Sequence, residues 1–254
     1  MQAYSAAFAQ IYNLRWRGFA QHVAPLIMDF YATTPIGRVN KTVLDVCCGT
    51  GQLALHFLEA GYQVTGLDLS ESMLHYAQEN TARFIETGQA RFIHADASHF
   101  SLDDRFGLVV STFDALNHLP GEVALKDCFR CVFAVLEANG FFIFDLNTAV
   151  GLRGWNVISV DDSSDELLLV NRGIFDEASG KAWDRITGFV RVPGETTYTR
   201  FDETVYNVLF DLEFVRAALL EIGWKEVYLA PVEDLKTLLA DPEAAKRVFI
   251  VASK

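Results

Sequence analysis

Glycines and acidic residues recur where the apolar runs of this chain end, and together they could hold a nucleotide-like ligand. The run VLDVCCGTGQ (43–52) contains Gly49 and Gly51 between a predicted buried strand and a helix that begins near Gln52. Glycine lets backbone N–H groups approach a ligand closely. From Gly49 the spacing is G-x-G-x-x-A, which satisfies a loose dinucleotide fingerprint. By itself this turn is a weak signal, because glycine turns between strands and helices are common.

The next two runs place acidic residues near the same turn. VTGLDLS (64–70) contains Asp68, 19 residues after Gly49, where a carboxylate could accept hydrogen bonds from both ribose hydroxyls at about 1.5–3 kcal/mol each. The alternative is that Asp68 caps the following helix. RFIHADAS (91–98) places Asp96 at the same carboxyl edge of the predicted sheet, so we interpret Asp96 as a nucleobase contact rather than only a turn former.

The fourth run ends in STFDALNHL (111–119), and its loop offers polar side chains for proton transfer. Asp114 and His118 are the candidates for catalysis, and His118 is the better general base because the unperturbed pKa of histidine is about 6.5. Asn117 is a candidate for binding a substrate. The alternative is that His118 caps or packs against the next helix.

Two later regions could also supply polar contacts. Asp145 and Asn147 follow the fifth run and could line the substrate side, although a role in a turn fits them equally well. Further along, Trp183, Glu203 and Tyr206 could reach over the pocket. Strand alternation does not decide which face of a sheet these last three side chains occupy.

Four cysteines equal the number of ligands in a structural zinc site, but their spacing argues against metal binding. Cys128 and Cys131 form a C-x-x-C inside a continuous helical pattern without a glycine knuckle. Neighbouring Cys47 and Cys48 would point in opposite directions in an extended chain. We therefore expect free thiols and no metal, and no thioredoxin-like redox pair.

The segments that must position these residues are short apolar runs that alternate with helical stretches. The runs span 42–47, 62–68, 90–96, 106–113 and 140–146, and the helical stretches span 51–61, 70–86 and 122–139. This alternation predicts an α/β fold: a doubly wound, mostly parallel sheet with helices on both faces. We expect residues 41–154 to form this ligand-binding core.

The rest of the chain divides into three parts. Residues 1–40 have apolar residues at helical spacing, and residues 155–210 have strand-like stretches with turn signals, which predicts an inserted antiparallel β meander. Residues 211–254 resume with a helix, for which Asp211 is the expected N-cap and Gly223 the residue after the end. Closing strands then complete the core.

Composition narrows the class of molecule that this protein could bind. The chain has 254 residues, 33 acidic against 21 Lys plus Arg, and a formal net charge of -12, so it would repel a phosphate backbone. A small molecule is a better partner than nucleic acid. No apolar stretch reaches the ~20 residues of a membrane span, and the first residues do not read as a signal peptide. A cytoplasmic setting fits the low cysteine count, and a homodimer is left open.

Four segments in order resemble the class I S-adenosylmethionine-dependent methyltransferases. They are VLDVCCGTG, VTGLDLSESML, ARFIHADAS and VLEANGFFIFDLNT, and the resemblance covers roughly residues 42–148. The family usually has an acidic residue two places before a small-x-G-x-G turn, and Asp45 fills that place. A loop that binds NAD has no such requirement. The resemblance implies a Rossmann-like fold, S-adenosyl-L-methionine as cofactor and a small-molecule methyl acceptor with an N or O nucleophile.

The resemblance also implies roles for individual residues. The acidic residue and the turn would surround the methionine end of the cofactor, Asp68 would hold the ribose, and two side chains would lie beside the adenine. The FAQIYN segment is similar to the helical lid of many small-molecule members, so residues 1–40 would form a lid. The cofactor-binding residues expected on this basis are Tyr12, Asp45, Cys47, Gly49, Gly51, Asp68, Leu69, Met73, Asp96, Ala97 and Phe113. The substrate-binding residues expected are Asn117, Asp145 and Tyr206.

Three positions depart from the family pattern. Cys47 stands where glycine or alanine is commoner, Gly107 stands where an aspartate is usual, and LEANG replaces the usual turn before the fifth run. These departures weaken the assignment to a subfamily but not the prediction of the cofactor. Two other functions stay open: an NAD-dependent oxidoreductase, supported by the G-x-G-x-x-A spacing and Asp68, and a non-catalytic cofactor-binding regulatory protein.

Overall fold

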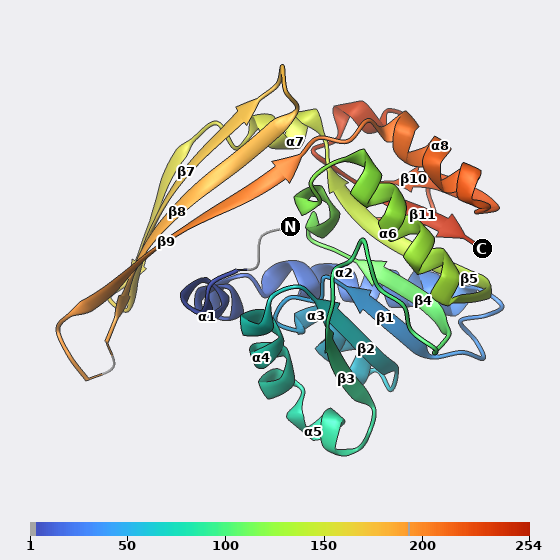
Figure 1. The fold of residues 1–254 in the computed structure, drawn as a ribbon, viewed down its shortest axis with the longest axis horizontal. Coiled ribbons are helices and arrows are strands. Elements are labelled where there is room, and N and C mark those ends of the chain that lie inside the picture. The colour runs from blue at the N-terminus through green and yellow to red at the C-terminus, as the bar shows by residue number, and fades with distance from the viewer. Residues whose placement is uncertain (1–3, 193) are drawn as a thin grey trace.

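The computed structural model describes residues 4–192 and 194–254 and contains two separate sheets (Figure 1). The larger sheet has seven strands in the order β10-β11-β5-β4-β1-β2-β3. Its strands are β1 Thr42–Val46, β2 Gln63–Asp68, β3 Ala90–His94, β4 Phe106–Ser111, β5 Leu136–Asn147, β10 Glu226–Ala230 and β11 Arg247–Ser253. Strands β1 to β5 pair in parallel, whereas β11 runs antiparallel to both β5 and β10. The predicted mostly parallel sheet is confirmed.

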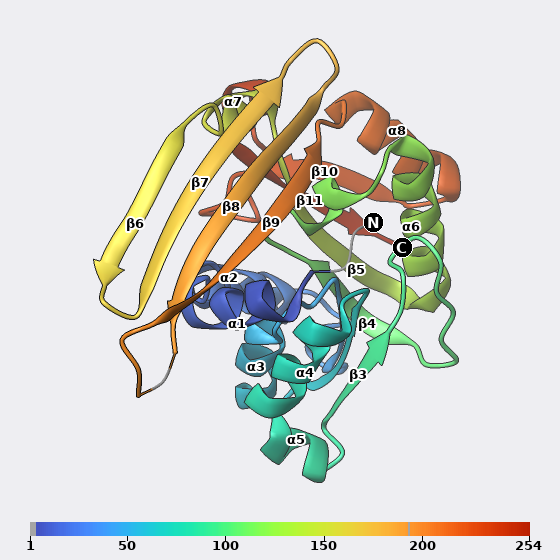
Figure 2. The same ribbon diagram turned by 60° about the vertical axis from the view of Figure 1, so that its left-hand side comes forward.

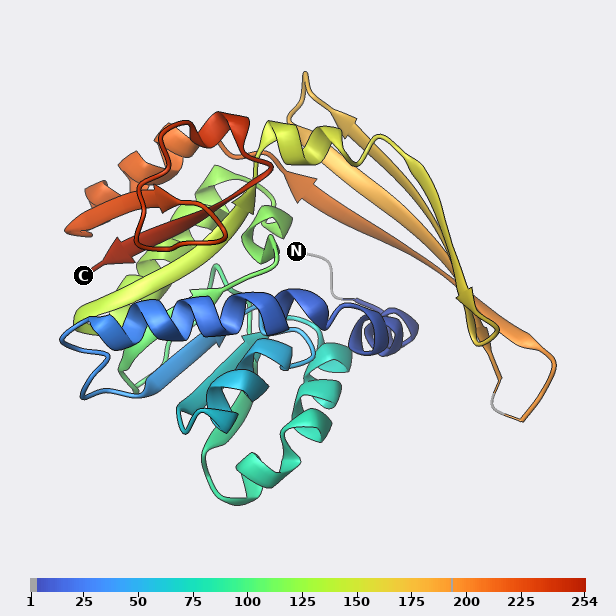
Figure 3. The ribbon, with the colours of Figure 1, turned by 180° about the vertical axis from the view of Figure 1, so that it is seen from behind.

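Helices cover both faces of this sheet because its strands are apolar on both sides. One buried cluster packs α6 and α8 against the sheet, and a second packs α2 and α3 against the opposite face (Figures 1 and 3). The helices are α1 Ala6–Arg15, α2 Gly18–Thr33, α3 Gln52–Glu59, α4 Glu71–Asn80, α5 Ala82–Glu86, α6 Glu122–Val135, α7 Ala149–Arg153 and α8 Leu212–Ile222. The doubly wound architecture follows from these two buried faces.

Helix caps agree with the sequence. The Asp211 side chain accepts a hydrogen bond from the backbone N–H of Phe214 and begins α8, and Gly223 ends it with φ 117°. At α4 the cap is Ser70, which accepts a hydrogen bond from the N–H of Met73. Asp68 is therefore not the N-cap of that helix. This leaves its carboxylate available for another role.

The predicted meander is a four-stranded antiparallel sheet that stands beside the core (Figure 2). Its strands are β6 Ile158–Ser164, β7 Leu167–Asp176, β8 Lys181–Arg191 and β9 Tyr198–Val208. Apolar side chains of its inner face, among them Leu169, Ile186 and Phe201, pack against Phe8 and Ile11 of α1. Helix α1 therefore lies between this insert sheet and the core.

The two N-terminal helices have different positions. α1 packs between the insert sheet and Met73 of α4, whereas the buried face of α2, with Val23, Ile27 and Tyr31, belongs to the core of the large sheet. Residues 1–3 of the expected lid lie outside the described part of the chain. Within the described residues, no helix combines the length and apolarity that a membrane crossing requires.

Candidate active site

The glycine turn adopts a left-handed backbone at three positions. Cys47, Gly49 and Gly51 have φ values of 60°, 54° and 73°. A Cβ on Gly51 would lie 3.0 Å from the Cβ of Ala77 in α4, so only glycine fits both the backbone conformation and this close approach. Cys47 adopts the same region with a side chain, which costs free energy that glycine would not. The unusual residue of the turn is thus accommodated, and its thiol is free.

Asp68 is tied to this turn. Its Oδ2 accepts a hydrogen bond from the N–H of Gly49 at 2.8 Å, and its Oδ1 accepts one from the N–H of Ser70 at 2.8 Å. Burial raises the pKa of this carboxyl, and the two N–H donors partly oppose the rise. Each carboxylate oxygen keeps a lone pair for another donor. The carboxylate is thus held rigidly on the wall of a cavity.

Asp45 is more deeply enclosed. Only 2% of its surface is exposed, and its Oδ2 has no hydrogen-bond partner among the described residues. Burial and, secondly, the negative charge of Asp68 raise the pKa of Asp45 to about 8. It lines a small cavity of about 40 Å³ together with Thr50, whose Oγ1 also lacks a partner. Two unpaired buried oxygens in one cavity are expected where a ligand supplies the missing donors.

A second cavity of about 330 Å³ adjoins the first, because Tyr12, Cys47 and Phe113 line both. Its walls come from α1, from the carboxyl ends of the parallel strands and from the insert sheet. Ten of the expected site residues line it: Tyr12, Cys47, Gly49, Asp68, Leu69, Met73, Phe113, Asp114, His118 and Tyr206. Asn147 lines it too. Residues from segments far apart in the sequence therefore meet in one site.

Other expected residues lie outside both cavities. The Oδ1 of Asp96 accepts hydrogen bonds from the N–H and the hydroxyl of Ser98, at 2.8 and 2.7 Å, so this carboxylate closes a turn. Ala97 is 1% exposed and packs in the core. Gly51 is used for packing against α4. The expected contacts of Asp96 and Ala97 with adenine stay predictions.

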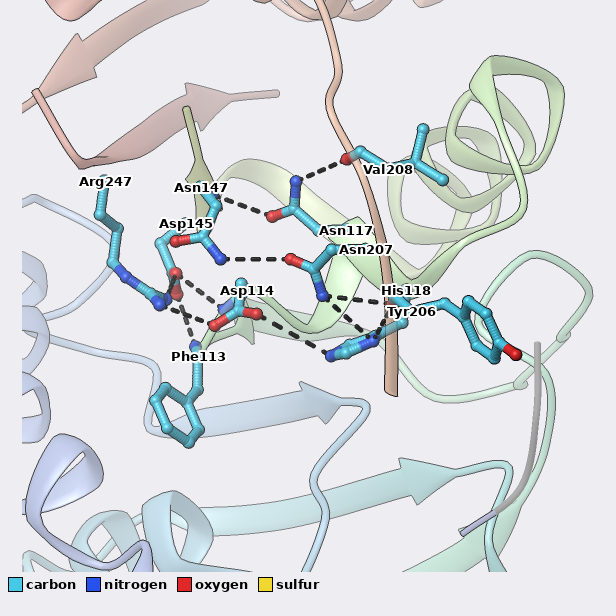
Figure 4. A network of polar contacts seen from close by, with 10 residues as sticks. All are labelled: Phe113, Asp114, Asn117, His118, Asp145, Asn147, Tyr206, Asn207, Val208 and Arg247. Carbon is cyan, nitrogen blue, oxygen red and sulfur yellow. Dashed lines mark hydrogen bonds and ion pairs between the residues drawn. The ribbon is translucent and has the colours of Figure 1, made fainter. Parts of the chain in front are cut away.

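Asp145 holds the loop after β4 rather than lining the cavity (Figure 4). It is fully buried, and its carboxylate accepts hydrogen bonds from the N–H groups of Phe113 and Asp114 at 2.6 and 2.8 Å. These two residues have left-handed backbones, with φ 67° and 49°. Arg247 pairs with Asp145 and, at 2.7 Å, with Asp114. The structure thus gives Asp145 a positioning role, because its oxygens are already used inside the protein.

Arg247 also contacts aromatic rings. Its guanidinium carbon lies 4.9 Å from the ring centroid of Phe19 and 5.6 Å from that of Phe113, and these two rings stack on each other at 4.8 Å. Burial raises the pKa of Asp145, whereas the positive charge of Arg247 lowers it. The arginine therefore compensates two buried carboxylates and fixes the conformation of residues 113–114.

His118 has a defined tautomer. Its Nδ1 lies 2.6 Å from the carbonyl oxygen of Tyr206 in β9, and a carbonyl can only accept, so Nδ1 carries the proton (Figure 4). In neutral His118 the lone pair is then on Nε2, which lies 3.9 Å from an oxygen of Asp114. A proton taken up by Nε2 would be stabilised by that carboxylate. The arrangement is that of a general base with a carboxylate partner.

Three asparagines connect this loop to the insert sheet (Figure 4). Asn117 accepts a hydrogen bond from the N–H of Asn147 at 2.9 Å and donates one to the carbonyl of Val208 at 2.8 Å. Asn147 donates to the Oδ1 of Asn207 at 3.2 Å. Asn117 is fully buried and joins β9 to the core. Its expected contact with a substrate stays a prediction.

Two polar residues of the cavity, Arg247 and Asp184, were not expected from the sequence. Arg247 begins the last strand and pairs in register with Asn147, so the antiparallel pairing of the closing strand with β5 was the available signal. Asp184 also lines the cavity. Its signal was an acidic residue between Ala182 and Ile186 on the apolar face of a strand. Glu203, by contrast, binds the N–H and the hydroxyl of Ser5 at 3.1 and 2.6 Å.

All four cysteines are free thiols, and burial raises the pKa of Cys128. In residues 4–192 and 194–254, no group of three or more His, Cys, Asp or Glu side chains is arranged to hold a metal ion. A high pKa disfavours the thiolate, which is the reactive form. The chemistry of the site therefore comes from its carboxylates, its histidine and any bound cofactor.

Comparisons with known proteins agree with this geometry. Residues 43–140 match the family model described as a methyltransferase domain. This part of the chain is a methyltransferase domain. The methyltransferase is similar to the putative methyltransferase YqeM of Bacillus subtilis (strain 168), with 29% identity over 184 residues, 72% of this chain and 73% of the relative.

Two further similarities extend this result. An N,N-dimethyltransferase of Streptomyces fradiae, named for dTDP-3-amino-3,6-dideoxy-alpha-D-glucopyranose, is 31% identical over 143 residues, 56% of this chain and 54% of the relative. The crystal structure of a S-adenosylmethionine-dependent methyltransferase from Clostridium acetobutylicum ATCC 824 has a TM-score of 0.77 at 22% identity. That likeness covers 97% of each chain and therefore includes the insert sheet.

The residues of the site fit S-adenosylmethionine, the cofactor of this class. The unpaired oxygen of Asp45 is suited to the positively charged methionine end, and Asp68 is suited to ribose hydroxyls. Leu69 and Met73 add apolar side chains to the cavity wall, and their expected contact with adenine stays a prediction. When bound, the cofactor supplies an electrophilic methyl group on a sulfonium.

Proposed function

We propose that this methyltransferase transfers a methyl group to an amine of a small polar molecule, with His118 as the proton acceptor. The observation that carries the proposal is the hydrogen bond from His118 Nδ1 to the carbonyl of Tyr206, which leaves the lone pair of this cavity-lining histidine on Nε2. The partner carboxylate of Asp114 is 3.9 Å from that nitrogen. A neutral base next to a carboxylate is suited to removing a proton from an ammonium group.

The character of the cavity supports an amine rather than an anionic acceptor. Asp68, Asp114 and Asp184 line it, and Arg247 is already paired with two carboxylates. An anion would therefore meet net negative charge. The names of two relatives agree: the Streptomyces fradiae protein is named for methylation of an amino sugar, and a relative from Aphanothece halophytica is a glycine/sarcosine N-methyltransferase.

The chain's own residues perform the steps that this reaction needs. Tyr4, Phe8, Tyr12 and Trp16 of the α1 region cover the cavity and exclude water. The acceptor is oriented between the loop of His118 and the insert sheet, which supplies proximity. His118 Nε2 takes the proton of the acceptor, and the adjacent Asp114 stabilises the imidazolium. Arg247 keeps Asp114 in place.

Cofactor titration and a substrate screen test this proposal. We expect calorimetry to detect binding of S-adenosylmethionine and S-adenosylhomocysteine, and no competing binding of NAD. A pool of primary and secondary amines incubated with S-adenosylmethionine should yield a product heavier by one methyl group in mass spectrometry. Tight binding of NAD alone would support an oxidoreductase instead. Sulfonium binding without any methylated amine would contradict the acceptor class and favour a regulatory protein.

His118→Gln separates a catalytic histidine from a structural one. Glutamine can donate a hydrogen bond to the Tyr206 carbonyl but cannot take up a proton. We expect kcat to fall at least 100-fold while the cofactor Kd changes less than threefold. An unchanged kcat would remove His118 from the mechanism.

The setting and assembly of the methyltransferase are also proposals. Four free thiols support a cytoplasmic location. A homodimer is proposed alongside it, and light scattering of the purified protein at micromolar concentration tests it directly. Residues 1–40 are proposed as the lid, in which α1 is the part that lines the cavity.

A further inference from the structure

Asp184 is a cavity carboxylate that the mechanism above does not use. It lies on β8, opposite Gly173 of β7 and Val205 of β9, and it lines the larger cavity. Its Oδ1 is buried and has no hydrogen-bond partner among the described residues. An unsatisfied buried oxygen costs about 1–3 kcal/mol, so its retention on a cavity wall calls for an explanation.

Two arginines near Asp184 are bonded to other groups. Arg172, which lies opposite Arg185 on the neighbouring strand, donates to the hydroxyl of Thr187 at 3.2 Å, and Arg185 pairs with Asp202 at 3.3 Å. Among residues 4–192 and 194–254, no ion pair to Asp184 is formed. Burial raises the pKa of Asp184, and a backbone hydrogen bond from Arg172 opposes that rise. The Oδ1 of Asp184 therefore lacks a hydrogen-bond donor, and a positively charged donor would also compensate the carboxylate.

The position of Asp184 places it at the acceptor end of the cavity. Its cross-strand neighbour Val205 directly precedes Tyr206, whose carbonyl oxygen binds His118. Asp45, which fits the methionine end of the cofactor, lines the adjoining cavity, whereas Gly49 and Asp68 line the same cavity as Asp184. Asp184 is thus on the insert sheet next to the proposed base.

The surroundings of Asp184 also suit a cation. Trp155 lines the cavity with it, and its backbone carbonyl packs so closely against Gly173 that a Cβ there would lie 2.1 Å from the oxygen. The glycine therefore allows the Trp155 segment to approach the strand next to Asp184. An aromatic side chain beside a carboxylate favours an ammonium group over neutral or anionic groups.

We propose that Asp184 is the specificity residue for the acceptor and that it binds a positively charged amino group. The inference rests on the proposed amine methylation and names the residue that recognises the amine. The ammonium group donates a hydrogen bond to the carboxylate, which then has the partner that the protein does not supply. Neutral alcohols of the same shape lack the charge and bind more weakly.

A pair of isosteric probes tests Asp184 without any methyl transfer. We would titrate protein saturated with S-adenosylhomocysteine with cyclohexylammonium and with cyclohexanol, and follow binding by ligand-observed NMR. The wild-type protein should bind the ammonium probe at least tenfold more tightly than the alcohol. Asp184→Asn, which keeps the shape and removes the charge, should abolish this preference. The matched control Asp162→Asn changes an exposed carboxylate of the same sheet and should keep the preference.

The remaining outcomes are also decisive. Equal binding of the ammonium probe to wild type and Asp184→Asn would overturn the proposal, as would no preference in the wild type. Urea unfolding of Asp184→Asn should show no loss of stability, since the variant removes a partly buried charge that has no ion-pair partner. If the preference depends on Asp184 but no amine in the pool is methylated, the recognition site stands and the proposed function fails.

Separate measurement of KM and kcat completes the test, with any amine that the wild-type methyltransferase methylates. Asp184→Asn should raise KM for that amine at least tenfold, while the Kd of S-adenosylhomocysteine changes less than twofold. A fall in kcat with unchanged KM would instead place Asp184 in the chemical step and contradict a recognition role. The Asp184→Ala variant should show the same pattern.

Discussion

The seven-stranded sheet of the core and the four-stranded insert sheet are packed in different ways. Val109 in the core is fully buried, with helices on both faces of its sheet, whereas Val160 on β6 is 61% exposed. The insert sheet buries only its inner face, against α1. The core therefore has the rigidity that the cofactor turn requires, and the insert is held by a smaller set of contacts.

This difference in packing coincides with a division of the proposed site into a cofactor part and an acceptor part. The turn of Gly49, Asp45 and Asp68 belongs to the core, whereas Asp184 and Tyr206 belong to the insert sheet. His118 lies where the two regions meet, because its ring is bonded to a backbone carbonyl of β9. Changes in the core should alter stability and cofactor binding, and changes in the insert should alter the acceptor step.

The largest effect is expected at the arginine under the loop of His118. Arg247→Ala leaves the carboxylates of Asp145 and Asp114 without their cation, so unfolding free energy should fall by about 3–5 kcal/mol. Urea denaturation measures this loss. Arg216→Ala, on the exposed side of α8, is the control and should change stability by less than about 0.5 kcal/mol. Equal stability of the two variants would refute the structural role of Arg247.

Asp45 should produce an effect of opposite sign. Because its pKa is raised to about 8, the native protein keeps a proton that the unfolded chain has lost above pH 4. Stability therefore decreases as pH rises from about 4 to about 8 and then levels off. In the cofactor-free protein, Asp45→Asn should abolish this decrease and be more stable at pH 8 by on the order of 5 kcal/mol.

The same substitution of Asp45 should weaken the binding of the cofactor. Asp45→Asn should bind S-adenosylmethionine at least tenfold more weakly, because an amide cannot ionise to pair with the positive charge of the cofactor as the carboxyl group can. Asp29→Asn on the exposed side of α2 is the control for both measurements. A parallel pH dependence of stability in wild type and Asp45→Asn would show that another group is responsible.

Asp68 should affect the cofactor with less effect on folding. Asp68→Ala is expected to weaken the binding of S-adenosylhomocysteine at least tenfold, or about 1.4 kcal/mol, as measured by calorimetry. Asp103→Ala replaces an exposed aspartate outside the cavities and should bind normally. Normal binding by Asp68→Ala would mean that the ribose anchor lies elsewhere.

The smallest effect is expected at the joint between the two regions. Asn207→Ala removes the acceptor of the Asn147 amide, which should lower stability by about 1 kcal/mol. Because β9 also orients His118, kcat should fall several-fold at an unchanged cofactor Kd. Asn171→Ala removes a different amide of the same sheet and should leave kcat unaltered. A change in cofactor affinity in Asn207→Ala would contradict the separation of the cofactor part from the acceptor part.

Much of the core was predictable because its signals are local. The strand, glycine turn and helix of residues 42–59 follow from apolar runs, and Asp211 and Gly223 bound α8 as expected. That Asp45, Gly49 and Asp68 come together was equally predictable, since parallel strands bring their carboxyl ends to one edge of the sheet. Their contacts with the cofactor stay predictions.

The contacts of the residues on the acceptor side could not be predicted from the sequence in the same way. Asp145 and Asn117 end up buried with all their bonds inside the protein, although their positions at strand ends suggested a substrate contact. Their partners, Arg247 and β9, lie 102 and 91 residues away in sequence. No local pattern encodes such a pairing, because it depends on which surfaces the closing strand and the insert sheet meet.

The sequence by itself determined the two-face apolar pattern of the core, the left-handed glycine turn and the acidic residues at successive strand ends. Those features depend on neighbours a few residues apart, and local sterics and burial decide them. Only the tertiary structure decided the tautomer of His118, the ion pairs of Arg247 and the place of Asp184. These depend on contacts between α1, the insert sheet and the strand ends, which exist only once the separate elements have packed together.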